Sequence, residues 1–437
     1  MEKQTIKTVI GQKQQAIGSI RLLQRGHLFD EHTNYVLVGV RRAGKSYTLY
    51  QDIQKKLSEG TATTEDILYV NFEDERIASI RAEELGLLLE AYWEMYDQKR
   101  PFIYLDEVQN ITGWEKFARR LADEGYRVMI TGSNAKMLSG EIATTLGGRY
   151  VPREIFPFSF AEFLAYRGII PQKNWEYKTE ERLSVVRAFQ EYFYAGGFAE
   201  VFDKTDKREW LTALYQKILM GDIVERNAIR NPRVFRLLAR KLADSVMRPT
   251  TLRRLEHIIK SSGDSISQTV LKDYLDYMQQ AYLTFSVPNL ISPLTEQQTI
   301  VKRYFIDNGI LNNFLLQGET KLLENLVAVH LNKHYRNTAE ELRLFYYYKG
   351  VEVDFCIPDI QQAIQVNYSI EDADTYKREV GNLCRFLKVF KEYRGIIVTW
   401  DTERHITHDG IAIEAIPVWK WLLMGDQTTE AYIGRQA

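Results

Sequence analysis

An α/β fold in three parts is indicated by this 437-residue sequence. β-branched runs alternate with helical stretches from residue 35 to residue 132, which is the pattern of a doubly wound parallel sheet. After Pro157 the spacing of apolar residues is that of amphipathic helices, to about residue 287. Strand-like runs return after residue 300. We therefore expect a parallel-sheet domain at residues 1–165, an all-helical domain at 166–290 and a second α/β domain at 291–437.

The first domain is expected to begin irregularly, because residues 1–34 are polar and interrupted. Its strand runs are rich in β-branched and aromatic residues, as strands buried in a parallel sheet are. The expected strands are residues 35–39, 67–72, 102–106 and 128–132, and the expected helices are residues 47–57, 83–96 and 114–123.

Prolines mark both later boundaries. Pro152 and Pro157 precede the helical part, in which we expect helices at residues 160–166, 181–194 and 210–220. Pro288 and Pro293 precede the last part. There the expected strands are residues 301–306, 344–348, 351–356, 363–368 and 395–400, and the expected helices are residues 322–334 and 373–390.

Composition and charge exclude several classes of protein. The 57 basic and 58 acidic side chains give a net charge of −1, so any surface for nucleic acid must be local. No apolar run has the length of a membrane span, and the first residues lack a hydrophobic signal core. With Cys356 and Cys384 as its two cysteines, we expect a cytoplasmic protein with buried thiols, no disulfide and no cysteine zinc site.

The turn after the first expected strand carries the strongest motif of the chain. Residues 39–46, GVRRAGKS, match the phosphate-binding P-loop, or Walker A, pattern, in which backbone N–H groups wrap phosphates at the start of a helix. Lys45 is expected to face the β- and γ-phosphates, and Ser46 to ligate the Mg²⁺ that bridges them. The expected nucleotide contacts are Gly39, Arg42, Ala43, Gly44, Lys45, Ser46 and Tyr47. The alternative is an ordinary glycine turn.

Two carboxylates end the expected strand at residues 102–106. Asp106 and Glu107 lie where the carboxyl end of a parallel strand opens onto the ligand crevice. Asp106 is expected to hold Mg²⁺ through water, and Glu107 to orient or deprotonate the water that attacks the γ-phosphate. Acidic residues commonly end strands, so this pair indicates a nucleotide site only in combination with the upstream P-loop.

The next expected strand ends in polar residues, at Thr131-Gly-Ser-Asn134. Asn134 is the candidate for a catalytic residue that senses the γ-phosphate or the attacking water. The alternative is that Ser133 or Asn134 caps the helix that follows. The two roles are compatible.

These motifs together resemble a prokaryotic AAA-superfamily P-loop ATPase over about residues 18–165. The resemblance is carried by residues 39–46, 105–109 and 131–134, by Leu146-Gly-Gly-Arg149, and by residues 156–163. More narrowly, the chain resembles ATPases with a winged-helix-like middle and a C-terminal domain similar to restriction-endonuclease-fold nucleases. The resemblance extends to nearly the whole chain, and the preference for ATP rests on it.

The resemblance also implies an arginine finger. In that superfamily an arginine before the fifth strand can reach the γ-phosphate of a neighbouring subunit, and Arg149 matches this location. Arg153 is a rival, and a salt bridge or a capping role is the alternative for Arg149. Within the loop, Arg41 and Arg42 either touch phosphate or only solvate the loop.

A local basic excess lies in the middle segment. Residues 226–254 contain nine basic side chains and one acid, Asp244, and residues 252–280 resemble a helix-turn-helix. The helix expected to read DNA, residues 268–280, holds Lys272 but also Asp273 and Asp276, which argues against base readout. Nonspecific DNA contact, a solvated face and an acidic surface in a homo-oligomer remain the interpretations of this segment, and Arg226 could alternatively sense the nucleotide.

The C-terminal acids depart from the nuclease pattern that they resemble. Glu324, Glu352 and Asp354 have the spacing of metal ligands, but Gln365 and Asn367 stand where such nucleases place an acid and a lysine. One ligand and the lysine are therefore expected to be missing. We expect a noncatalytic recognition or scaffold domain, with a metal-dependent nuclease as the alternative.

The sequence thus predicts a hydrolase that uses ATP and Mg²⁺. We expect ATP hydrolysis to drive a conformational change or assembly on a macromolecular partner. The alternative is a nucleotide-gated interaction module with little turnover. Nonspecific DNA through residues 226–254, a protein and a second copy of the chain are the candidate partners, whereas a membrane is not.

Overall fold

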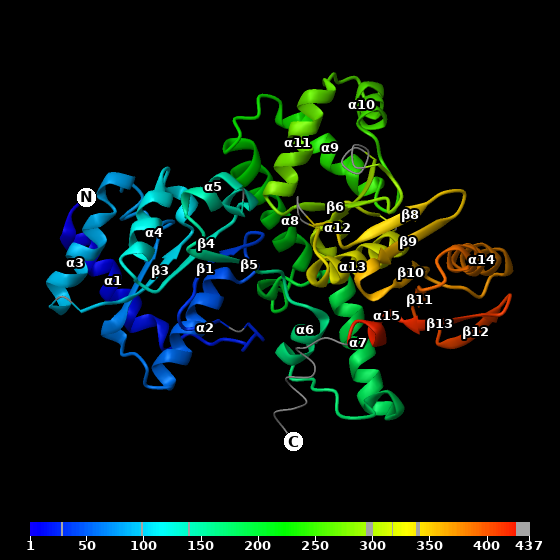
Figure 1. Ribbon diagram of the computed structural model, residues 1–437, viewed down its shortest axis with the longest axis horizontal. Coiled ribbons are helices and arrows are strands. Elements are labelled where there is room, and N and C mark those ends of the chain that lie inside the picture. The colour runs from blue at the N-terminus through cyan, green and yellow to red at the C-terminus, as the bar shows by residue number, and fades with distance from the viewer. Residues whose placement is uncertain are drawn as a thin grey trace. The chain divides into compact units, whose positions relative to one another are not determined.

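The computed structural model describes residues 1–27, 29–97, 99–138, 140–293, 300–316, 318–337 and 341–424. These residues form two compact units (Figure 1). Unit 1 is Met1–Phe156 together with Gln280–Tyr282, and unit 2 is the rest. The predicted border at residues 290 and 291 lies inside unit 2, so the division into three domains stays a prediction.

Unit 1 contains a five-stranded parallel sheet in the order β2-β3-β4-β1-β5. The strands are β1 (Asn34–Val38), β2 (Ile67–Asn71), β3 (Phe102–Asp106), β4 (Val128–Gly132) and β5 (Tyr150–Glu154). Val38 of β1 pairs with Gly132 of β4, and Asn71 of β2 pairs with Asp106 of β3. The carboxyl ends of the strands therefore lie along one edge of the sheet, as the sequence predicted.

Helices alternate with these strands: α2 (Lys45–Ser58), α3 (Gly86–Tyr96), α4 (Trp114–Asp123) and α5 (Gly140–Thr145). The expectation of an irregular start is wrong, because α1 (Lys3–Ile17) precedes them and packs against α3 and β2. The side chains of Ile6, Val9, Ile10 and Ile17 are buried. Their spacing gives a narrow apolar stripe on a polar helix.

β5 was not predicted as a strand. Its central Pro152 has no N–H to donate, which argues against a strand in the middle of a sheet. β5 lies at the edge beside β1, where a proline is tolerated. The expected end of the sheet therefore came one strand too early.

Unit 2 begins with helices, as the sequence predicted. They are α6 (Phe160–Tyr166), α7 (Thr179–Ala195), α8 (Lys207–Lys217), the π-helix η7 (Ile218–Glu225), α9 (Pro232–Asp244), α10 (Leu252–Ser261) and α11 (Gln268–Gln280). The expectation of an all-helical segment to residue 290 is wrong at its end, because β6 (Thr284–Pro288) pairs antiparallel with β7 (Val301–Phe305). Thr250, just before α10, also bridges to Val301. Three helices followed by a hairpin suit a winged-helix assignment, which stays a prediction.

The last part of unit 2 is a mixed sheet in the order β12-β13-β11-β10-β9-β8. Its strands are β8 (Phe345–Tyr348), β9 (Glu352–Ile357), β10 (Gln362–Val366), β11 (Arg394–Thr399), β12 (Arg404–His408) and β13 (Ile411–Pro417). The helices of this part are α12 (Asn308–Asn312), α13 (Glu319–His334), α14 (Ala373–Val389) and α15 (Val418–Trp421). The strands β12 and β13 and the helices α12 and α15 were not predicted.

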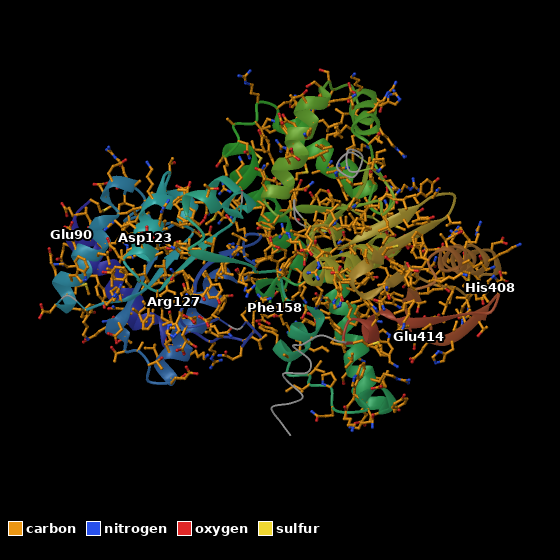
Figure 2. The ribbon with its side chains drawn as sticks, in the orientation of Figure 1. Glu90, Asp123, Arg127, Phe158, His408 and Glu414 are labelled. Atoms are coloured by element: carbon orange, nitrogen blue, oxygen red, sulfur yellow. The ribbon has the colours of Figure 1, made fainter. Side chains whose placement is uncertain are left out.

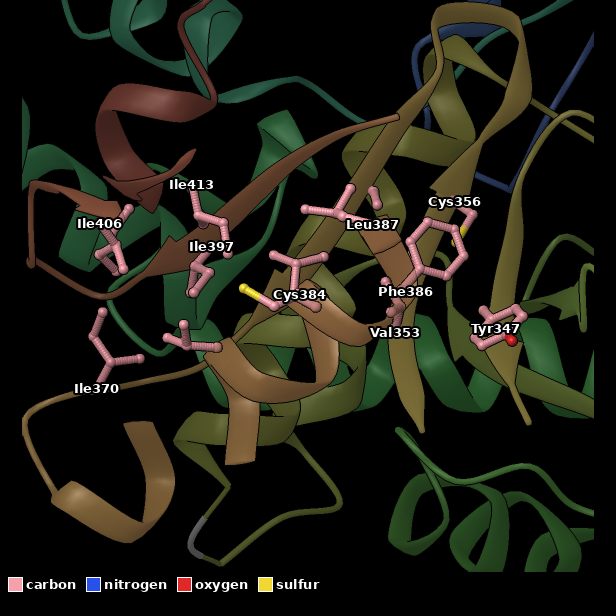
Figure 3. Packing of buried hydrophobic residues seen from close by; sticks show 14 of the residues in the cluster. Tyr347, Val353, Cys356, Ile370, Cys384, Phe386, Leu387, Ile397, Ile406 and Ile413 are labelled. Atoms are coloured by element: carbon pink, nitrogen blue, oxygen red, sulfur yellow. The ribbon is translucent and has the colours of Figure 1, made fainter. Parts of the chain in front are cut away.

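Helix α14 packs on this sheet and closes a hydrophobic core. Figure 3 shows Phe386 of α14 beside Val353 of β9, and Ile397 of β11 in the same group of buried side chains. Cys356 and Cys384 are buried and free in the same core, as predicted. Within the described ranges, no helix is both long and apolar enough to cross a membrane.

Candidate active site

The loop between β1 and α2 has the backbone of a phosphate cradle. A Cβ on Gly39 would lie 2.1 Å from the carbonyl oxygen of Ile155, so only glycine fits where the loop leaves β1. Gly44 caps α2 with a φ of 99°, which L-residues rarely adopt. Between them, the N–H of Ala43 donates to the Val40 carbonyl and closes the turn.

The first turn of α2 presents free backbone donors. Its first intrahelical backbone bond runs from the N–H of Thr48 to the carbonyl of Gly44, so the amides of Lys45, Ser46 and Tyr47 precede any intrahelical acceptor. These N–H groups and the helix dipole favour an anion at this point. The geometry of the loop is thus suited to phosphate.

Arg25 supports this loop and was missed by the sequence analysis. Its guanidinium donates to the carbonyl of Ala43 at 3.1 Å and to the carbonyl of Phe156 at 3.0 Å. The side chain is buried, although it comes from the segment that was expected to be irregular. No motif surrounds Arg25, so nothing in the sequence could have indicated this role.

Lys45 is held inside the site. Its Nζ lies 3.2 Å from the carbonyl oxygens of Gly39 and Val40 and 3.4 Å from Oε1 of Glu107. The residue is only 3% exposed. The structure therefore brings together the P-loop lysine and the acidic residue that follows β3, which are 62 positions apart in the sequence.

Asp106 is fully buried at the end of β3 and has two hydroxyl donors. Tyr69 donates to Oδ2 and Thr131 donates to Oδ1, each at 2.5 Å. Burial, followed by the Glu107 carboxylate, raises the pKa of Asp106 above its ordinary value. Hydrogen bonds from Thr131, Tyr69 and Ser46 act in the opposite direction. The Ser46 hydroxyl is therefore near the Asp106 carboxylate, as the prediction of a shared metal site requires.

Glu107 has a strained backbone, with a φ of 54°. Its N–H donates to Oγ1 of Thr131 at 2.9 Å, and its Oε2 accepts from Nε2 of Gln109 at 2.5 Å. Burial acts to raise the pKa of Glu107, but the Lys45 ammonium and the Gln109 amide outweigh it, so the pKa is lowered. Glu107 is thus a charged carboxylate with a fixed direction.

Thr131 links the two acidic residues, since the same hydroxyl donates to Asp106 and accepts from the N–H of Glu107. Gln109 extends the network to Oγ of Ser133 at 3.2 Å. Both residues lie in segments that carried the resemblance, but neither had been assigned a role. Their positions were the available signal, because Thr131 lies near the end of β4 and Gln109 shortly after β3, and these two strands are adjacent in the sheet.

Asn134 lies two residues beyond β4. Its Oδ1 accepts the N–H of Lys136 at 2.8 Å, which is the capping geometry expected as the alternative to a sensor. The position at the strand end is compatible with both roles, so the sensor assignment stays a prediction.

Arg149 does not join the cluster around Lys45. Its Nε donates to Oδ1 of Asp123 at 2.8 Å, and its side chain is 55% exposed. Figure 2 labels Asp123 at the end of α4. The rival Arg153 lies over the ring of Tyr35. The pair between Arg149 and Asp123 is the salt bridge expected as the alternative to an arginine finger. Because Arg149 is exposed, a second chain can still reach it.

The side chains at the loop suit the predicted cofactor. A magnesium ion bound with a nucleotide needs few protein ligands, because phosphate oxygens and water complete its shell. Ser46 and Asp106 offer oxygen atoms as ligands. Because the Tyr69 and Thr131 hydroxyls already donate to the Asp106 carboxylate, a contact between Asp106 and magnesium through a water molecule is favoured. Tyr47, 52% exposed beside the loop, is open to a ligand.

The C-terminal acids come together, but not as predicted. Asn367 stands at the position of the nuclease lysine, but the cluster contains a different lysine that was not predicted, because Lys302 of β7 contacts Glu324, Glu352 and Asp354. Lys302 comes from outside the motif and so could not be found by spacing. Gln365 donates to Oε2 of Glu379 at 2.6 Å.

Comparison with known proteins supports these observations. Residues 31–164 match the AAA domain family, and residues 186–321 match a domain of unknown function, DUF8612. The uncharacterized protein MJ1544 of Methanocaldococcus jannaschii is 35% identical over 401 residues, which cover 89% of this chain and 88% of that protein. An uncharacterized protein of Haemophilus influenzae is 29% identical over 397 residues, which cover 89% and 94%.

Solved structures are more distant. The Walker-type ATPase PABY2304 of Pyrococcus abyssi has a TM-score of 0.39 and 15% identity over 68% of this chain and 99% of its own. The ORC1 protein of Aeropyrum pernix, solved in complex with DNA, has a TM-score of 0.27 and 14% identity over 74% and 93%. Scores this low have no weight for fold or function. The sequence comparison shows that this chain belongs to the family of the Methanocaldococcus jannaschii protein MJ1544, and its residues 31–164 match the AAA domain family.

Proposed function

We propose that this protein is a magnesium-dependent ATPase whose nucleotide site lies between the P-loop and the end of β3. The observation that carries the proposal is the contact between Lys45 and Glu107, at 3.4 Å, beside the first amides of α2, which precede any intrahelical acceptor. A buried ammonium on loop carbonyls and one carboxylate is ready to exchange these partners for phosphate oxygens. The match to the AAA domain family supports the same reaction class.

The residues have distinct roles in this proposal. Lys45 and the first amides of α2 bind the phosphates, and Ser46 and Asp106 hold magnesium, which supplies positive charge to the phosphate oxygens when bound. Glu107, directed by Thr131 and Gln109, accepts a proton from the attacking water. Its lowered pKa keeps it ionised at neutral pH. Asn134 and, from a second chain, Arg149 are further candidates for contacts with the γ-phosphate.

Phosphate release from ATP tests these roles. Lys45→Ala is expected to lower the rate by about 100-fold or more, and Glu107→Gln by a similar factor while binding persists. Lys55→Ala is the matched control, because Lys55 is exposed on the same helix. Equal rates in the wild type, Lys45→Ala and Glu107→Gln would exclude both assignments. A wild type that binds ATP without releasing phosphate would favour the nucleotide-gated module.

Nonspecific nucleic-acid contact is a second candidate function, favoured by a groove in unit 2. This groove, of about 440 Å³, lies among α8, α9 and the segment after α12. Arg236 and Arg240 line it without an acidic partner among the described residues, and Nδ2 of Asn313 is buried there without a hydrogen bond. Surplus donors suit phosphate oxygens. Three other basic residues among residues 226–254 form ion pairs with acidic side chains. Fewer of the nine basic residues are therefore available to a phosphate than the sequence suggested.

Salt-dependent binding of duplex DNA, with and without ATP, tests this candidate. The double variant Arg236→Glu/Arg240→Glu is expected to weaken binding and to flatten the dependence on salt. Arg385→Glu/Lys391→Glu carries the same charge change at exposed positions near the end of α14 and serves as the control. Equal losses in both double variants would mean that only net charge matters. DNA contact at the groove would then be rejected.

A further inference from the structure

The acidic cluster of unit 2 is built around a buried ammonium. Nζ of Lys302 lies 2.9 Å from Oδ1 of Asp354, 2.9 Å from Oε1 of Glu352 and 3.3 Å from Oε1 of Glu324. The ammonium donates hydrogen bonds to Asp354 and Glu324 and forms an ion pair with Glu352. Lys302, Glu324 and Asp354 are buried, whereas the side chain of Glu352 is 37% exposed at the edge of the cluster.

Two of the three carboxyl groups also accept a hydrogen bond from a second donor. Oδ2 of Asp354 accepts the N–H of Val366 at 2.9 Å, and Oε1 of Glu324 accepts the hydroxyl of Tyr304 at 2.7 Å. Carboxylate oxygens at 2.9–3.3 Å from a common point suit an ammonium, whereas Mg²⁺ requires about 2.1 Å and Ca²⁺ about 2.4 Å. A divalent ion at this point would also meet the positive charge of Lys302.

We propose that Lys302 is a built-in counter-cation that takes the place of a divalent metal among Glu324, Glu352 and Asp354. The C-terminal sheet of unit 2 then works without metal, and the nuclease that the spacing of its acids suggests is inactive. Among the described residues, no group of three or more His, Cys, Asp or Glu side chains is arranged to hold a metal ion. The residues present therefore do not fit the metal that a nuclease would need.

The same ammonium ties distant segments together. Lys302 belongs to β7 of the hairpin, Glu324 to α13, and Glu352 and Asp354 to β9 of the sheet. One buried side chain thus joins the hairpin that follows the helical part to the C-terminal sheet. This contact supports the grouping of both parts in one compact unit.

Binding of Mn²⁺ to the nucleotide-free protein tests the proposal, with electron paramagnetic resonance as the readout. The wild type and Asp354→Asn are expected to bind equally little Mn²⁺, because the cluster has no vacancy. Lys302→Met leaves three carboxylates without a cation. It is expected to have a thermal midpoint about 10 °C lower, to bind Mn²⁺ and to regain part of the midpoint when Mn²⁺ is added.

The double variant Lys302→Met/Asp354→Asn is the control, and it is expected to lose the acquired Mn²⁺ binding. Stoichiometric Mn²⁺ binding by the wild type that disappears in Asp354→Asn would overturn the proposal. So would cleavage of DNA by the wild type, with Mg²⁺ or Mn²⁺, that Asp354→Asn abolishes. If Lys302→Met does not fold, the comparison of the wild type with Asp354→Asn alone decides. None of these readouts depends on ATP hydrolysis.

Discussion

Two buried lysines, Lys45 in unit 1 and Lys302 in unit 2, make opposite uses of the same ammonium group. Lys45 contacts two backbone carbonyls and one carboxylate at 3.2–3.4 Å, beside amides that lack partners in α2. Lys302 contacts three carboxylates at 2.9–3.3 Å and is fully enclosed. The first arrangement, which we call the open site, has weak contacts that a phosphate can replace. In the second arrangement, the closed cluster, the ammonium already occupies the point between the carboxyl groups where a metal ion would bind, so it contributes to stability.

The largest expected effect is a difference in stability between the two sites. Lys302→Met should lower the free energy of unfolding by about 3–5 kcal/mol, because it leaves buried carboxylates without a counter-charge. Lys45→Met should lower it by about 1 kcal/mol, because mainly carbonyl contacts are lost. Urea unfolding of both variants measures the difference. Equal losses would mean that the two lysines have equivalent structural roles.

Thr131 offers a way to disturb the open site without touching Lys45. Thr131→Val removes the hydroxyl that serves both Asp106 and Glu107, at nearly constant volume. We expect ATP hydrolysis to fall about tenfold, or about 1.4 kcal/mol in barrier height, while ATP still binds. Thr131→Ser retains the hydroxyl and should recover the rate. A normal rate in the valine variant would show that Glu107 needs no such support.

The closed cluster should also give stability a dependence on pH. Burial, followed by the Asp354 carboxylate, raises the pKa of Glu324, so the folded chain holds this proton more tightly than the unfolded chain does. Its contribution is therefore complete at low pH and is lost as pH rises through the raised pKa. We expect Glu324→Gln to gain about 1–2 kcal/mol relative to the wild type between pH 5 and pH 9. The free energy of unfolding is measured with urea across this pH range. If it changed with pH in the same way in Glu324→Gln and in the wild type, the prediction would be wrong.

The smallest expected effect concerns Arg149. Its pair with Asp123 is exposed, so Arg149→Ala should change the free energy of unfolding by less than about 0.5 kcal/mol. If Arg149 acts on a neighbouring chain, the variant should hydrolyse ATP more slowly only at concentrations where the wild type self-associates. Rates measured across a dilution series, together with Arg119→Ala as an exposed control, would reveal a finger or exclude one.

Much of the open site could be predicted because its signals are local. The P-loop is a contiguous motif, and β3 and β4 have the predicted bounds because strands buried in a parallel sheet are continuous apolar runs. The adjacency of Asp106 to the loop followed from the rule that parallel strands end at one edge. By contrast, β5 could not be predicted because it contains Pro152, and α1 could not be predicted because its composition is mostly polar.

The closed cluster could not be predicted because its partners are distant in sequence. Lys302 lies 22 positions from Glu324 and 52 from Asp354, on three different elements. The spacing of the acids was visible, but nothing in the sequence indicated which cation they share. Arg25 was missed for the same reason, since a guanidinium that reaches backbone carbonyls leaves no pattern.

Calorimetric titration of ATP into the nucleotide-free protein, in the presence of Mg²⁺, tests the central claim most directly. The open site predicts one ATP per chain, with affinity reduced at least about 100-fold by Lys45→Ala and unchanged by Lys302→Arg. Absence of binding to the wild type, or equal affinity in the wild type and Lys45→Ala, would contradict a triphosphate site at the P-loop.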